Sequence, residues 1–189
     1  MASYKYLGDY RLENVEKNGK LKTVAVYKGK YYAFVDPLSL SRDRVKLLVC
    51  GGAFWLAQLI ALTLPSDWAR LPFVIMPMVF AMLAFWFASL GLYTAYFAKS
   101  PLVREQAEKV QSRFAGGSLI AAALSGASLI GSFVGYFTAI RIHPVNDVIF
   151  TLCAAVQTAG AILCFLSRER FRTGVVSSAE DENADAQDD

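Results

Sequence analysis

Residues 71–97 read LPFVIMPMVFAMLAFWFASLGLYTAYF, a run that contains no Asp, Glu, Lys, Arg or His. About 20 apolar residues in a helix cross the hydrocarbon core of a bilayer. The run therefore predicts a transmembrane helix. Because it is longer than needed, we expect it to tilt or to place Tyr93 and Tyr96 among the lipid headgroups.

Three further apolar runs of membrane-spanning length lie on either side, at residues 47–64, 116–140 and 145–166. The charged residues are concentrated in the connections, and 55% of the 189 residues are hydrophobic. This segregation is unlike an ordinary soluble domain, in which charges are spread throughout. The sequence predicts an all-α membrane protein, a four-transmembrane-helix bundle over residues 45–167 that carries a small β-meander before it.

The distribution of Lys and Arg predicts the orientation of this bundle. Basic residues are concentrated before the first run, between the second and third, and after the fourth, whereas the connections at 65–70 and 141–147 hold one each. Lys and Arg that flank spans are retained on the cytoplasmic side. We therefore expect both termini to be cytoplasmic, in an integral protein of the plasma or inner membrane.

Small residues recur at every fourth position of the third run, at Ala123, Ala127, Gly131 and Gly135. In lipid, helices associate where small residues let their backbones approach. This stripe is expected either to pack inside the bundle or to contact a partner, which would be another membrane protein or a second copy of the chain.

Buried polarity in the runs is sparse, with one glutamine in the first run and one in the fourth. Gln58 and Gln157 fall at similar predicted depths, so we expect an interhelical amide pair that contributes about 0.6–2 kcal/mol. The alternative is a polar path through a small transporter or pore, lined by these glutamines and Ser89.

Few residues suit catalysis or metal binding. The three cysteines lie in apolar runs without C-x-x-C spacing, which is typical of small hydrophobic residues, and no metal or cofactor site is predicted. His143 is the sole histidine. With Asp147 it predicts either a cap at headgroup level or, as the least favoured function, a lipid-modifying enzyme.

The first 40 residues are polar and predict the cytoplasmic antiparallel β-meander. Asn18-Gly19 is a strong hairpin signal. The predicted strands are 10–16, 20–27 and 30–35, and the expected contact surface consists of Lys20, Lys22, Lys28, Lys30, Tyr31 and Tyr32. Orientation accounts for the basic residues, so nucleic acid is not an expected partner.

Two further segments complete the predicted organisation. Residues 100–114 have the pattern of an amphipathic helix that either lies on the inner membrane surface or extends the third span. Residues 173–189 are predicted to form a disordered acidic tail. The leading interpretation is a non-enzymatic accessory or scaffold subunit that contacts the lipid bilayer and a partner.

Overall fold

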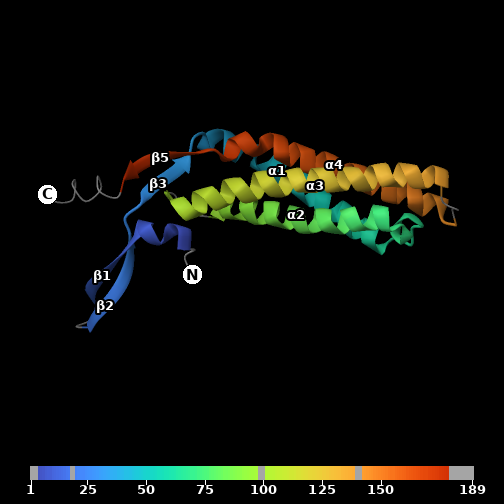
Figure 1. The fold of residues 1–189 in the computed structure, drawn as a ribbon. Helices are drawn as coiled ribbons and strands as arrows, with labels where there is room; N and C mark the ends of the chain where they lie inside the picture. The colour runs from blue at the N-terminus through green and yellow to red at the C-terminus, as the bar shows by residue number, and fades with distance from the viewer. Residues whose placement is uncertain (1–3, 18–19, 98–100, 139–141, 179–189) are drawn as a thin grey trace.

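The computed structural model describes residues 4–17, 20–97, 101–138 and 142–178. Four helices lie side by side in an elongated bundle, and the strands gather at one end of it together with both termini (Figure 1). We call this the sheet end, and the opposite end, which holds residues 64–71 and 142–143, the turn end. The elements are η1 (Tyr4–Asp9), β1 (Tyr10–Lys17), β2 (Lys20–Tyr27), β3 (Lys30–Phe34), α1 (Pro37–Thr63), η2 (Trp68–Arg70), α2 (Pro72–Phe97), β4 (Leu102–Val103), α3 (Arg104–Thr138), α4 (Pro144–Leu166), η3 (Ser167–Phe171) and β5 (Thr173–Ser178).

The prediction of four long apolar helices is confirmed: among the described residues, four are long and apolar enough to cross a membrane. α1 begins ten residues before the predicted span, at Pro37, and α3 begins at Arg104. The segment 100–114 therefore takes the second of its two predicted forms, since from Arg104 onward it continues directly into the third span. Ion pairs one turn apart, Arg104 with Glu108 and Lys109 with Glu105, support this extension.

The helices follow a ring in which α3 packs between α2 and α4, and α4 packs on α1. α1 meets α2 through large aromatic side chains. The rings of Phe54 and Phe85 stack with centroids 3.9 Å apart, and the Trp55 indole N–H donates to Ser89 Oγ at 3.2 Å. These aromatic side chains bridge the α1–α2 seam, whereas small residues allow close approach between α2 and α3.

The apolar core divides into two clusters along the bundle. One lies toward the sheet end and includes Leu47, Phe54, Phe85, Phe114 and Phe171. The other lies toward the turn end and includes Trp68, Val74, Met78, Phe150 and Cys153.

The strands form two sheets, which corrects the prediction of one three-stranded meander. β1 and β2 form an antiparallel hairpin, with Tyr10 opposite Tyr27 and Lys17 opposite Lys20; its predicted Asn18-Gly19 turn lies outside the described residues. β3 instead occupies the middle of a separate sheet, ordered β4-β3-β5. β3 does not join the hairpin because both of its edges are hydrogen-bonded to strands that are distant in the sequence, β4 and β5.

β5 also corrects the prediction for the carboxyl end. Residues 173–178 form this strand, antiparallel to β3, with Phe34 opposite Thr173 and Lys30 opposite Ser178. Residues 179–189, which contain the acidic run, lie outside the described part. The sheet therefore joins the segment before α1 to the segment after η3 beside the bundle (Figure 1).

Candidate functional site

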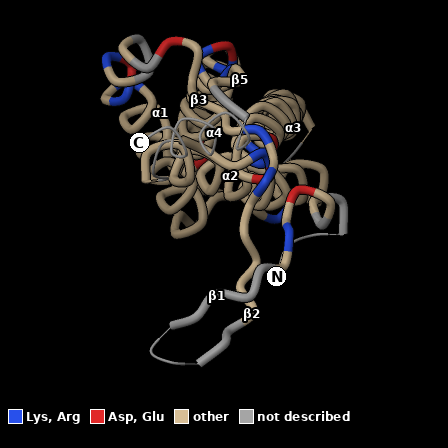
Figure 2. The backbone as a smooth tube through the Cα atoms, turned by 90° about the vertical axis from the view of Figure 1, so that its left-hand side faces the viewer, with Lys and Arg blue, Asp and Glu red and all other residues tan. Residues whose placement is uncertain are grey.

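The β1–β2 hairpin projects away from the helices at the sheet end (Figures 1 and 2). Leu12 is 73% exposed and Val24 is 44% exposed. Leu12 lies opposite Ala25, and Val24 lies opposite Glu13. Since neighbouring pairs of an antiparallel ladder point to alternate faces, an apolar side chain is exposed on each face of the hairpin.

Tyr27 fastens the base of the hairpin to the rest of the sheet end. Its ring centroid lies 5.2 Å from that of Tyr10 and 5.3 Å from that of Tyr31. Its hydroxyl donates to the Lys30 carbonyl at 2.8 Å and accepts the backbone N–H of Arg104 at 3.1 Å. Burial raises the pKa of Tyr27, so the hydroxyl retains the proton that it donates.

Tyr27 was not predicted from the sequence to be an anchor. Gly29, two residues later, is the signal that could have indicated its role. A Cβ on residue 29 would lie 2.5 Å from the Tyr27 hydroxyl oxygen. Gly29 leaves room for the tyrosine because glycine has no Cβ.

The predicted contact residues fall into three groups. Lys28 and Lys30 are exposed at the sheet end. Tyr31 and Tyr32 are half-buried in β3, where they lie opposite residues of both β4 and β5. The side chains of the remaining two, Lys20 and Lys22 on β2, lie outside the described part of the structure.

Acidic and basic residues both occur along the backbone at the sheet end (Figure 2). Asp43 contacts both Arg170 and Lys46 at 3.3 Å, which links the start of α1 to η3, the turn that follows α4. The Arg104 guanidinium lies 2.9 Å from Glu108. Three basic residues at this end, Lys46, Arg104 and Arg170, are therefore paired with carboxylates.

The structure divides the predicted small-residue stripe of α3. Gly131 and Gly135 are buried, Gly131 against the start of α2 and Gly135 against the ring of Trp68. Ala123 and Ala127 are exposed. Residues four apart on a helix are rotated by about 40°, so a stripe at every fourth position drifts around the axis. The buried face of this region instead follows Ala121, Ser125, Ser128, Ser132 and Gly135.

Gln58 and Gln157 are both fully buried, but the predicted bond between them is not formed. Within the described residues, neither nitrogen nor oxygen of either amide has a hydrogen-bond partner, and the same holds for the Ser128 hydroxyl. Ser89 is separately engaged, since it accepts from Trp55 and donates to the Phe85 carbonyl at 2.9 Å.

The two glutamines lie near the boundary between the apolar clusters. Along α1, Gln58 falls between Ala57 and Ala61 of the turn-end cluster, and Phe54 of the other cluster lies one turn before it. Along α4, Gln157 falls between Cys153 and Ala161, which belong to different clusters. The bundle therefore has a polar layer within its length.

At the turn end, two aspartates join the two helical hairpins. Asp147 Oδ1 accepts from the Ser66 hydroxyl and from the Asp67 backbone N–H, both at 2.8 Å. Asp67 Oδ2 in turn accepts the backbone N–H groups of Ile142 and His143, at 2.6 and 2.9 Å. Asp67 and Asp147 thus each accept hydrogen bonds from the connection of the other helical hairpin.

This arrangement corrects the predicted pairing of His143 with Asp147. His143 Nδ1 lies 3.5 Å from Asp67 Oδ1, while Asp147 is occupied by Ser66 and the Asp67 backbone. Across the described ranges, no group of three His, Cys, Asp or Glu side chains is placed to hold a metal ion. His143 occupies the N-cap position of α4, but its side chain makes no capping hydrogen bond there.

We expect the stability of the turn end to depend on pH through Asp67. The backbone N–H groups of His143 and Ile142 hold the pKa of Asp67 below its usual value. The ionised carboxylate stabilises the fold fully above the usual carboxyl range, and this contribution is lost as the pH falls through the lowered pKa.

The difference in melting temperature between the wild-type protein and Asp67→Asn checks this expectation. It should be largest near neutral pH and shrink as the solution is acidified below the usual carboxyl range. A difference that stays constant down to the lowest accessible pH would show that the carboxylate charge makes no contribution.

Comparisons with protein-family models, with curated proteins and with solved structures gave no match. Its function is therefore inferred from the geometry of this chain.

Proposed function

We propose that the protein is a non-enzymatic accessory or scaffold subunit of a membrane complex, with both termini cytoplasmic in a plasma or inner membrane. The four long apolar helices support a multi-pass membrane protein. In this proposal the sheet end is the cytoplasmic contact surface, and the β1–β2 hairpin is the part that binds a partner protein.

The observation that carries this proposal is the exposure of both hairpin faces. A two-stranded hairpin is marginally stable in water unless a third strand or a packed surface covers it. The base of this hairpin is fastened at Tyr27, whereas Leu12 and Val24 are exposed farther out. A partner that covers these side chains would stabilise the hairpin and gain apolar contact area.

The exposed part of the α3 stripe offers a second contact inside the bilayer. Ala123 and Ala127 face outward on the same helix whose Gly131 and Gly135 pack within the bundle. Another spanning helix could approach closely at these alanines. The partner in the membrane would be another membrane protein or a second copy of the chain.

Site-specific photocross-linking in native membranes tests the role of the hairpin. A photoreactive residue in place of Val24 should give one dominant cross-linked adduct with a partner protein, in stoichiometric yield. The same probe at Val176 on β5, which is 64% exposed at the same end, is the matched control and should not yield that adduct. Leu12→Asp, on the opposite face, should abolish the adduct because it places a charge in the apolar contact.

Three results would contradict the proposal: no adduct from Val24, an equal adduct from Val176, or an adduct that Leu12→Asp leaves unchanged. Both probe positions are exposed, so neither label requires the bundle to repack. A melting temperature equal to that of the wild-type protein confirms that each labelled variant is folded.

A second function, a small transporter or pore, is favoured by one observation, the buried unpartnered amides of Gln58 and Gln157. A polar group without a hydrogen bond in hydrocarbon costs several kcal/mol, and a permeating polar solute could supply the missing partners. Neither glutamine lines the groove between α2 and α3, the hollow that adjoins it or the groove between α1 and α2. The scaffold therefore remains the leading proposal.

Gln157→Leu separates the two functions. Because the wild-type amide is unpartnered, the substitution should leave stability unchanged or raise it. Solute flux through proteoliposomes should be unaffected for a scaffold and abolished for a pore. A flux that disappears in a variant of wild-type stability would favour the pore.

A further inference from the structure

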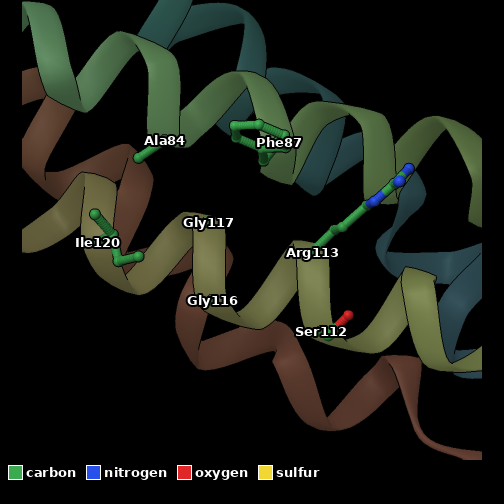
Figure 3. Close-up of a pocket in the computed structure, with 7 residues that line it drawn as sticks. All are labelled: Ala84, Phe87, Ser112, Arg113, Gly116, Gly117 and Ile120. Carbon is green, nitrogen blue, oxygen red and sulfur yellow. The ribbon is translucent and has the colours of Figure 1, made fainter.

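A groove of about 260 Å³ runs between α2 and α3 near the sheet end (Figure 3). Ala84 and Phe87 line it from α2, and Arg113, Gly116, Gly117 and Ile120 line it from α3. Ala84 and Ile120 lie at one end, and Arg113 extends from α3 toward α2 at the other. The lining is therefore apolar along its length and cationic at one end.

Arg113 differs from the other basic residues of α3 in its ion pairing. Arg104 pairs with Glu108, and Lys109 pairs with Glu105. No ion pair joins Arg113 to any acidic side chain within the described residues, and no charged residue follows it in α3. Arg113 is therefore the last charge before the apolar part of this helix.

A second hollow, of about 550 Å³, adjoins the groove and shares Ser112 and Gly116 with it. Its other lining residues are largely polar and include Tyr6, Lys109 and Gln111. Glu108 also borders it, but this carboxylate accepts from the Tyr6 hydroxyl at 3.1 Å and is paired with Arg104. The apolar groove and the hollow with polar lining residues therefore lie side by side.

We propose that the α2–α3 groove binds an anionic phospholipid. One acyl chain lies along Ala84, Phe87 and Ile120, and the phosphate group contacts Arg113, with Ser112 as a neighbouring hydroxyl donor. A guanidinium suits this position because its planar donors match phosphate oxygens. The adjoining polar hollow accommodates the rest of the headgroup.

The two adjacent glycines of the groove have different surroundings, which provides selective variants. A Cβ on Gly116 would meet no atom within 4 Å, so the groove is open there. A Cβ on Gly117 would lie 2.6 Å from the backbone nitrogen of Ala88. A larger residue at position 116 can therefore fill the groove without separating the helices.

Lipid retention by the full-length protein tests the proposal. The protein is reconstituted in vesicles of phosphatidylcholine and phosphatidylglycerol, extracted in mild detergent and examined by native mass spectrometry. The wild-type protein should retain phosphatidylglycerol in preference to phosphatidylcholine. Arg113→Gln should reduce that preference about five-fold, as expected for the loss of one cation near the membrane surface. Gly116→Leu should abolish retention of both lipids.

Lys46→Gln is the matched control, because it removes one positive charge at the same end of the bundle while Asp43 keeps its contact with Arg170. Its preference for phosphatidylglycerol should equal that of the wild-type protein. The proposal is overturned if Arg113→Gln retains the lipid normally, if Lys46→Gln loses it equally, or if the wild-type protein shows no preference. Arg113→Gln decides the question even if Gly116→Leu does not fold.

Discussion

Replacing Gly117 with alanine is expected to lower the free energy of unfolding by about 1–3 kcal/mol. The added Cβ would lie 2.6 Å from the Ala88 nitrogen and 2.7 Å from the Ala84 carbonyl oxygen. Both are backbone atoms, so the clash is relieved only if α2 and α3 move apart. In a bilayer this separation is costly, because helix association there depends on close packing. Equilibrium unfolding in a denaturing detergent, followed by circular dichroism, measures the change.

Gly116→Ala is the matched control, since it makes the same chemical change one residue earlier. Open space surrounds that position, so we expect no loss of stability and a gain of up to about 1 kcal/mol from helix propensity. Equal effects at the two positions would mean that α2 and α3 do not approach each other as described.

Replacing Asp147 with leucine is expected to destabilise the protein by about 2–4 kcal/mol, because it leaves two buried donors without their acceptor. These donors are the Ser66 hydroxyl and the Asp67 backbone N–H, both bound to Asp147 Oδ1. Asp147 itself is fully buried, so water cannot readily replace it. Thermal unfolding measures the loss, and faster hydrogen exchange at residues 66–68 should locate it.

Asp147→Asn separates the acceptor from the charge. Both bonds go to the same oxygen, and Oδ2 has no hydrogen-bond partner within the described residues. An amide oxygen in the Oδ1 position can keep both bonds, so we expect a much smaller loss than for leucine. If asparagine and leucine destabilise equally, the negative charge is the stabilising property.

The two ends of the bundle are joined in different ways. At the turn end, Asp67 and Asp147 connect the hairpin of α1 and α2 to that of α3 and α4. At the sheet end, β5 brings the carboxyl end of the chain against β3. The hairpin of β1 and β2 projects away from the bundle at the sheet end (Figure 1). This is why we assign partner binding to it.

The amino-acid sequence by itself determined the four long apolar helices. Their prediction needs only the length of an uncharged run, as in residues 71–97, because an apolar segment of that length satisfies its backbone as a helix wherever its neighbours lie. The Asn18-Gly19 signal likewise sufficed for the pairing of β1 with β2, since the two strands are adjacent in the chain.

Only the tertiary structure decided which surfaces meet. The pairing of β3 with β5 joins segments more than 130 residues apart, and neither strand carries a local signal for the other. Sequence spacing also could not show that Ala123 faces outward while Gly131 packs on α2, because the rotation of α3 is set by its neighbours.

The site residues follow the same division. Composition identified Gln58, Gln157, His143 and Asp147 as the unusual polar groups of an apolar chain. Their partners were decided by the packing of the hairpins, which places Asp67 beside His143 and, in the described part of the chain, gives neither glutamine amide a hydrogen-bond partner. Hydropathy and turn signals act through neighbours in the chain, whereas hydrogen bonds and close helix contacts depend on positions in space that local sequence does not encode.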